Sequence, residues 1–237
     1  MNPTPKLPLR KGTHTTLVVP GFQGSGPDHW QSWFETQVPE AQRVRDIDWE
    51  VPVLAHWATA LVREIDAASG PVWIVAHSFG CLAAVVAAAD RPERIGGALL
   101  VAPADPARFS PIGVRNQGVA PDVESLAPWI PASPLPFSSA VVASRNDPWL
   151  PFSEAIEWAE RWGSRLIDVG PQGHINAESG HGPWPAGLSL YRELVAAQGD
   201  LPIGELRSRM LKPQRRRLGA LAALRQGTRA MWTFPLG

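Results

Sequence analysis

The sequence predicts an α/β fold of three layers, in which helices cover both faces of a mostly parallel central sheet of about six strands. Short aliphatic or β-branched runs alternate along the chain with segments whose apolar residues recur at helical spacing. Such alternation implies right-handed crossovers between parallel strands. The chain has 237 residues, of which 44% are hydrophobic, and this is enough for one α/β domain with a substantial core.

The expected strands are short apolar runs, several of which end at Gly, Pro or polar residues. They lie at Thr15–Val19, Arg43–Ile47, Val72–Ala76, Gly97–Val101, Ser139–Ala143 and Arg165–Val169. The expected helices fill the segments between the strands or follow the last one. They lie at Asp28–Gln37, Val53–Ser69, Cys81–Ala89, Ser153–Trp162 and Pro185–Ala197. Ser153 is a plausible N-cap, because its hydroxyl can accept a free N–H of the first turn.

Two stretches do not follow this alternation. Pro106–Pro136 lacks a clear period and is expected to form a cap or lid over a site. We therefore assign residues 1–200 to the folded domain and residues 201–237 to a basic C-terminal extension that is partly helical or flexible. The extension carries many Arg side chains and a single acidic one, Glu205, with leucines at roughly helical spacing. It is expected to be solvated or to fold back on the domain, and contact with a membrane, nucleic acid or a protein partner is the alternative.

Composition limits the compartment and the partners. The formal net charge is zero, so no overall field favours nucleic acid, and none is expected to bind the core. Cys81 is the only cysteine, which fits a reducing compartment, and neither a signal peptide nor a membrane-spanning run is recognisable, so we expect a cytoplasmic protein. Scattered histidines and the lack of metal or phosphate-loop motifs predict neither a metal nor a cofactor.

One strand-to-helix junction has the pattern of a nucleophile elbow. A sharp turn around Ser78 requires small residues two positions before and after it, and these are Ala76 and Gly80. Ala76 stands where the usual G-x-S-x-G pattern has its first Gly. The junction therefore predicts Ser78 as a nucleophile, with His77 packed or hydrogen-bonded within the elbow, and an ordinary turn capped by serine is the alternative.

A serine hydroxyl needs a base, and the base in turn needs an acid. His174 lies in a Gly-rich turn after the last expected strand and is favoured over His181, which lies farther from the strand end. Asp147 also follows a strand end and is favoured as the acid, while Asp105, after the strand next to the elbow, is the serious rival. Asp168 lies inside the last strand and is expected to be structural. Carboxyl ends of parallel strands share one edge of the sheet, and the order Ser, Asp, His is that of α/β-hydrolases.

Backbone donors and nearby side chains complete the expected site. The N–H of Phe79 follows the nucleophile at a helix N-terminus, where it can face a developing oxyanion. A second donor is expected from the loop after the first strand, namely the N–H of Phe22, with that of Gln23 as the next candidate. The side chains of Gln23, His29 and Trp149 are possible substrate contacts, although His29 is equally compatible with a surface position.

Several motifs in this order resemble the small serine hydrolases related to retinoblastoma-binding protein nine. The similarity spans about residues 15–194 and is carried by Val19-Pro20-Gly21, Gly26-Pro27-Asp28-His29-Trp30, Ala76-His77-Ser78-Phe79-Gly80, Ser144-Arg145-Asn146-Asp147-Pro148 and Gly173-His174-Ile175-Asn176. The resemblance implies an α/β-hydrolase with a triad at Ser78, Asp147 and His174. It implies nothing about the C-terminal extension.

These observations predict a serine hydrolase of the carboxylesterase type. It would cleave a small ester, thioester or amide through an acyl-enzyme, and its partner would be that small molecule. The alternative is a protein-binding module on a hydrolase scaffold, because a fold by itself does not fix a function.

Overall fold

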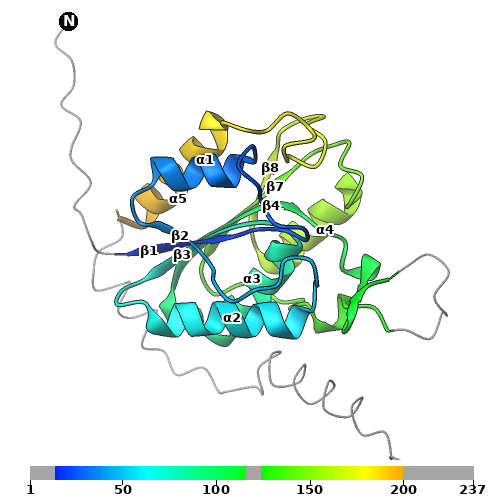
Figure 1. The fold of residues 1–237 in the computed structure, drawn as a ribbon, viewed down its shortest axis with the longest axis horizontal. Coiled ribbons are helices and arrows are strands. Elements are labelled where there is room, and N and C mark those ends of the chain that lie inside the picture. The colour runs from blue at the N-terminus through cyan, green and yellow to red at the C-terminus, as the bar shows by residue number, and fades with distance from the viewer. Residues whose placement is uncertain (1–13, 116–123, 200–237) are drawn as a thin grey trace, which may run out of the picture.

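The computed structural model describes residues 14–115 and 124–199, and its centre is a six-stranded sheet (Figure 1). The strand order is β2-β1-β3-β4-β7-β8, and every neighbouring pair is parallel. The strands are β1 Thr15–Val19, β2 Ala41–Arg43, β3 Val72–Ser78, β4 Ile95–Pro103, β7 Ser138–Ala143 and β8 Arg165–Asp168. The prediction of a parallel sheet of about six strands is confirmed.

Helices form a layer on each face of this sheet (Figure 1). They are α1 Trp30–Gln37, α2 Leu54–Ala67, α3 Phe79–Asp90, α4 Phe152–Trp162 and α5 Pro185–Gly199. Helices α2, α3 and α4 bury their apolar residues in one core cluster, and α1 and α5 bury theirs in a second cluster on the opposite face. The three predicted layers are therefore present.

The central strand β3 shows why its residues form a buried strand. Side chains along a strand alternate between the two faces of a sheet. Ile74 and Ala76 belong to the cluster under α2 and α3, whereas Trp73 and Val75 belong to the cluster under α1 and α5. Because both faces are covered, the strand reads as a continuous apolar run.

The second strand is shorter and earlier than the sequence predicts. Arg43–Ile47 was the expected span, but β2 ends at Arg43. This edge strand pairs only with β1, in a register that joins Val18 to Arg43. Asp46 then adopts a positive φ of 58°, which ends the extended run. The apolar residues Val44 and Ile47 thus come after the end of β2, although the N–H of Val44 still bonds to the carbonyl oxygen of Val18 in β1.

Two helix starts also differ from expectation. Helix α1 begins at Trp30 instead of Asp28, because His29 is its N-cap. Helix α4 begins at Phe152, and its N-cap is Pro151, which makes no side-chain cap. The prediction of Ser153 as the N-cap was therefore wrong, since that residue already lies inside the first turn.

The stretch Pro106–Pro136 contains short elements. They are η2 Pro106–Arg108, β5 Phe109–Ser110, β6 Gly113–Val114 and η3 Ala127–Trp129, and β5 pairs with β6. Residues 116–123 within it, and the extension 201–237, lie outside the described residues. None of the described helices is both long and apolar enough to span a bilayer.

Gly80 in the first turn of α3 packs against the end of β1. A β-carbon at this position would lie 2.6 Å from the backbone oxygen of Val19 and closer still to that of Pro20. We expect Gly80→Ala to lower the free energy of unfolding by about 1–3 kcal/mol or more, because neither backbone oxygen can move away cheaply. This corresponds to a fall in Tm of several degrees, at about 2–4 °C per kcal/mol.

Gly26→Ala is the matched control for a thermal melt monitored by circular dichroism. A β-carbon on Gly26 would meet no atom within 4 Å. Its melting temperature should stay near that of the wild type, and an equal fall in both variants would contradict the packing explanation.

Candidate active site

Ser78 lies where β3 turns into α3, in a strained backbone conformation. Its φ is 53° and its ψ is −126°, a region that non-glycine residues occupy at a cost of about 1–3 kcal/mol. The turn is sharp, and Gly21 approaches it closely, because a β-carbon on Gly21 would lie 2.7 Å from that of Ser78. The local geometry is that of a strand-to-helix elbow with the hydroxyl at its tip.

The structure brings Ser78, His174 and Asp147 together in one hydrogen-bonded chain. His174 Nε2 lies 2.8 Å from Ser78 Oγ, and His174 Nδ1 lies 2.9 Å from each carboxylate oxygen of Asp147. A carboxylate can only accept, so Nδ1 carries the proton and Nε2 is left to accept the hydroxyl proton of Ser78. All three side chains are buried or nearly so.

Hydrogen bonds hold the two loops that carry the base and the acid. Ser144 Oγ accepts the N–H of Gln172 at 2.9 Å, and the side-chain oxygen of Asn146 accepts the N–H of Gly173 at 2.7 Å. The Asp147 carboxylate also accepts the N–H of Trp149 at 2.8 Å. The loop after β7 therefore fixes the loop after β8, across neighbouring strands of the sheet.

The rival acids and the rival base are engaged elsewhere. Asp105 is the N-cap of η2 and accepts the N–H of Ala107 at 2.7 Å. Asp168 binds Arg145 at 2.7 Å, and this hydrogen bond, together with the N–H of Gly170, lowers the pKa of its carboxyl. His181 lies beside Ser179 and is not among the residues around Ser78 Oγ.

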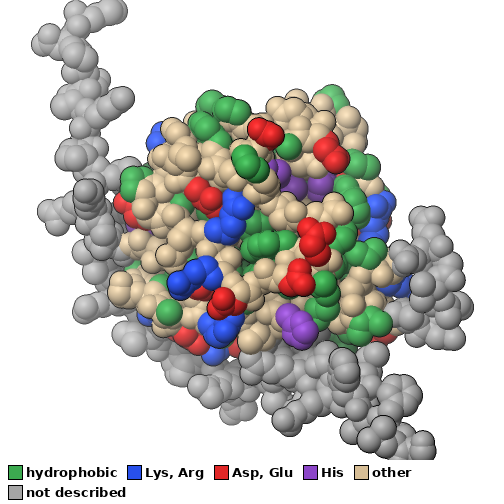
Figure 2. Space-filling model, in the orientation of Figure 1, with side chains coloured by type: hydrophobic (Ala, Val, Ile, Leu, Met, Phe, Trp, Pro, Cys, Tyr) green, Lys and Arg blue, Asp and Glu red, His purple; other side chains and the backbone are tan. Residues whose placement is uncertain are grey.

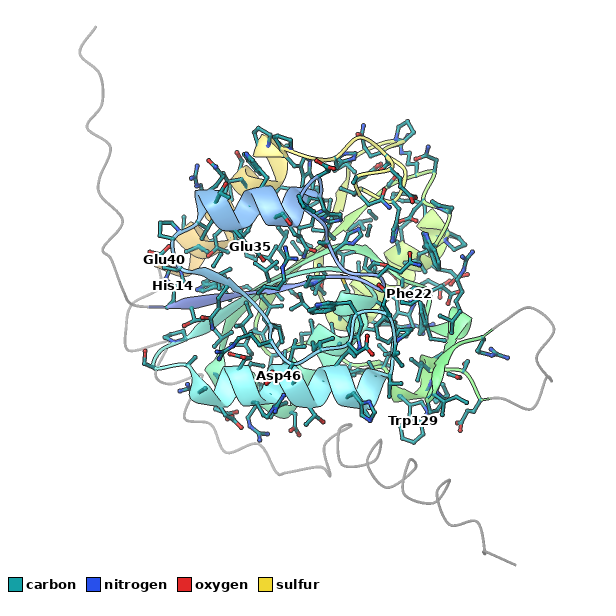
Figure 3. All side chains as sticks on the ribbon, in the orientation of Figure 1. His14, Phe22, Glu35, Glu40, Asp46 and Trp129 are labelled. Carbon is teal, nitrogen blue, oxygen red and sulfur yellow. The ribbon has the colours of Figure 1, made fainter. Side chains whose placement is uncertain are left out.

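The two predicted backbone donors belong to Phe79, which follows Ser78, and to the loop after β1. The N–H of Phe79 opens α3, whose first-turn donors have no partner within the helix. Phe22 follows β1 and is labelled in Figure 3 beyond the carboxyl end of that strand. No described residue accepts a hydrogen bond from the N–H of Phe22, whereas the N–H of Gln23 donates to Trp49 at 2.8 Å. Of the two loop candidates, only the Phe22 N–H is therefore free to meet an oxyanion.

A cavity of about 360 Å³ opens at Ser78 and His174. The three predicted contact residues Gln23, His29 and Trp149 all line it, but so do residues that the sequence does not predict as substrate contacts. These are Gly24, Gly26, Pro27, Asp28, Phe109, Asn176, Ala177 and Glu178. Figure 2 shows histidine side chains close together on the face in view, with acidic side chains nearby.

His29 is buried, so the surface position is excluded. Its Nδ1 caps α1 by accepting the N–H of Gln31 at 3.1 Å, and its Nε2 is buried without a partner among the described residues. Burial, and secondarily the positive charge of Arg43, lowers the pKa of His29 to about 4. The ring is thus neutral at pH 7 and adds no positive charge beside His174.

The described residues contain no group of three or more His, Cys, Asp or Glu side chains that could hold a metal ion. The polar groups hydrogen-bonded in line with Ser78 are instead a hydroxyl, a base and an acid, and the backbone N–H groups of Phe22 and Phe79 are unpaired donors. Chemically, this set can transfer a proton, attack a carbonyl carbon and stabilise an oxyanion.

Comparison with known proteins agrees with this geometry. A sequence model of the family described as serine hydrolase matches residues 16–193. A YdeN-like hydrolase from Pectobacterium atrosepticum is 39% identical, with a TM-score of 0.67 over 78% of this chain and 92% of that chain. The ydeN gene product of Bacillus subtilis is 19% identical, with a TM-score of 0.58 over 78% of this chain and 100% of that chain.

A third structure extends the likeness in fold. Est1E from Butyrivibrio proteoclasticus, solved with ferulic acid bound, is 15% identical, with a TM-score of 0.58 over 80% of this chain and 89% of that chain. No curated protein sequence matches the chain.

Proposed function

Because the chain belongs to the serine hydrolase family and has an α/β-hydrolase fold, we propose that it cleaves a small ester, thioester or amide through an acyl-enzyme on Ser78. The observation that carries the proposal is the hydrogen-bonded chain from Ser78 Oγ through His174 to the Asp147 carboxylate. This chain supplies a nucleophile, its base and the group that orients the base.

In the first half of the proposed reaction, Ser78 Oγ attacks the substrate carbonyl carbon while His174 Nε2 takes its proton. The N–H groups of Phe22 and Phe79 stabilise the oxyanion that forms. His174 then returns the proton to the leaving alcohol, thiol or amine, and the acyl group remains on Ser78. The Asp147 carboxylate stabilises the imidazolium throughout. Neither a metal nor a cofactor takes part in any of these steps.

The cavity supports a small substrate. Its volume of about 360 Å³ lies near the lower end of the range for small-molecule sites, which is about 300–1,000 Å³. Gln23, His29 and Trp149 are the side chains that we propose to contact the substrate, as they line the cavity beside Ser78. Among possible substrates, a carboxylic ester is our first choice, and Est1E, which was solved with a carboxylic acid bound, has the same fold.

Two further proposals concern partners and place. We expect the folded part to act in the cytoplasm on a small molecule and not on nucleic acid. A contact of the basic extension 201–237 with a membrane or a protein stays a prediction, because those residues lie outside the described part of the chain. Equal liposome and protein binding by the full chain and a chain ending at residue 200 would contradict it.

A fluorophosphonate probe tests the proposed function directly. We expect one probe molecule per wild-type chain, attached to Ser78, because the probe reacts with a serine that has a base beside it. Mass spectrometry of the intact chain and of its peptides measures both the stoichiometry and the position. Ser78→Ala should remain unlabelled. If the wild type is not labelled either, the proposal is rejected in favour of a non-catalytic binding module.

A further inference from the structure

His77, the residue before Ser78, has one ring nitrogen fixed by the backbone. Its Nε2 lies 2.9 Å from the carbonyl oxygen of His174, and a carbonyl oxygen can only accept, so Nε2 carries the proton. Burial, and secondarily the charge of His174, holds the pKa of His77 well below 6.5. The ring is therefore neutral, and its other nitrogen, Nδ1, bears a free lone pair.

Nδ1 of His77 lies close to the reaction centre. Nδ1 makes no hydrogen bond to a described residue. Among the described residues, the buried side-chain atoms without a partner are His29 Nε2 and Trp129 Nε1, so Nδ1 is not fully buried. His77 also lines the cavity with Ser78 and His174. In addition, Nδ1 of His77 and Oγ of Ser78 both lie 3.3 Å from one point, the position that a β-carbon on Gly21 would take. Nδ1 thus lies near the Ser78 hydroxyl, and it is an acceptor that the catalytic steps above do not use.

We propose that His77 Nδ1 accepts a hydrogen bond from the water molecule that hydrolyses the acyl-enzyme on Ser78. The proposal rests on the proposed function. The water oxygen attacks the acyl carbon, and one of its protons passes to His174 Nε2. Its second hydrogen is donated to His77 Nδ1. The bond between the acyl carbon and Ser78 Oγ then breaks, Oγ takes the proton from His174, and the carboxylic acid leaves.

His77 neither gains nor loses a proton in this step, so it acts only by orienting the water. Two acceptors, one for each hydrogen, fix the direction of the water lone pair that attacks the carbon. Acylation uses the Ser78 hydroxyl and needs no water. Loss of the Nδ1 acceptor should therefore slow deacylation by about tenfold, which is the rate equivalent of one hydrogen bond, and leave acylation nearly unchanged.

Two variants separate this role from the anchoring of the His174 loop. In His77→Gln, the amide nitrogen has the same reach as Nε2 and can still donate to the His174 carbonyl, but no acceptor stands at the position of Nδ1. In His77→Asn, the side-chain oxygen can occupy the position of Nδ1, but no donor reaches the carbonyl. An orienting role predicts slow deacylation in the Gln variant, whereas a purely structural role predicts damage in the Asn variant.

The measurement is the partition of one acyl-enzyme between water and methanol. The full chain is supplied with p-nitrophenyl acetate and methanol, and methyl acetate and acetic acid are quantified. Methanol has a single O–H hydrogen, which goes to His174, so it loses nothing when Nδ1 is removed. We expect the ratio of methyl acetate to acetic acid to rise about tenfold in His77→Gln and to stay at the wild-type value in His77→Asn. Because the ratio compares two fates of the same acyl-enzyme, it does not depend on the folded fraction of a variant.

The outcomes distinguish the two proposals. An unchanged ratio in His77→Gln, or an equal rise in His77→Asn, overturns the role of His77 while the acyl-enzyme on Ser78 stands. If the wild type forms no acetylated Ser78 and releases no p-nitrophenol, the proposed function itself fails.

Discussion

Replacing Ser78 by alanine should lower the turnover of a p-nitrophenyl ester at least about 10³-fold, and replacing His174 by alanine should lower it to the same level. Without Oγ no acyl-enzyme forms, and without the imidazole the 2.8 Å hydrogen bond that takes the hydroxyl proton is lost. The two residues act as a unit, so the double variant should be no worse than either single one. Steady-state release of p-nitrophenol measures all three.

His181→Ala is the matched control for His174→Ala. The two histidines lie in the same connection between β8 and α5, but only His174 lines the cavity with Ser78. The backbone N–H of Trp30 donates to the backbone oxygen of His181, so removal of the His181 imidazole leaves that hydrogen bond in place. Full loss of turnover in His181→Ala, with His174→Ala still active, would transfer the role of base to His181.

The buried strands could be predicted from the sequence because their patterns are strong. A strand covered on both faces is mostly aliphatic or β-branched, and β1 begins and ends where such a run does, at Thr15–Val19. The edge strand β2 has one partner and a partly polar composition. The apolar residues Val44 and Ile47 therefore shifted the predicted strand past the observed span Ala41–Arg43. Pairing with β1 decides that span, and pairing is not visible in a local pattern.

The part of the candidate site that lies at strand ends could be predicted from the sequence. Ser78 is the last residue of β3, and Asp147 and His174 follow β7 and β8; the carboxyl ends of parallel strands meet at one edge of a sheet. The cavity wall depends on tertiary contacts. Phe109 reaches it from a short hairpin, and the N–H of Gln23 is taken by Trp49, which no sequence spacing indicates.

The capping role of His29 is a further case in which contacts decide. Imidazole is not a usual N-cap side chain, so the sequence favours Asp28 as the start of the helix. The structure instead pairs His29 Nδ1 with the N–H of Gln31 and buries the ring beside His77, with ring centres 4.9 Å apart. Burial and the fixed tautomer follow from that packing and not from the local sequence.

Replacing Asp147 by asparagine should lower turnover about 10⁴-fold while the fold is kept. The carboxylate now accepts Nδ1–H of His174 at 2.9 Å, which leaves Nε2 free to accept the proton of Ser78. An amide nitrogen in its place would donate to Nδ1 and move the ring proton to Nε2, where it faces the hydroxyl. The base would then hold the wrong tautomer. The ratio kcat/KM for a p-nitrophenyl ester, with a thermal melt beside it, measures this effect.

Asp105→Asn and Asp168→Asn are the controls that separate the three carboxylates. Asparagine is as good a cap as aspartate, so Asp105→Asn keeps the bond to the N–H of Ala107. Asp168→Asn loses the ion pair with Arg145, which is screened by solvent, so its loss should change stability little. Both variants should retain wild-type turnover. An inactive Asp105→Asn beside an active Asp147→Asn would move the acid to the loop after β4, and the hydroxyl would then depend on an imidazole oriented from the neighbouring strand.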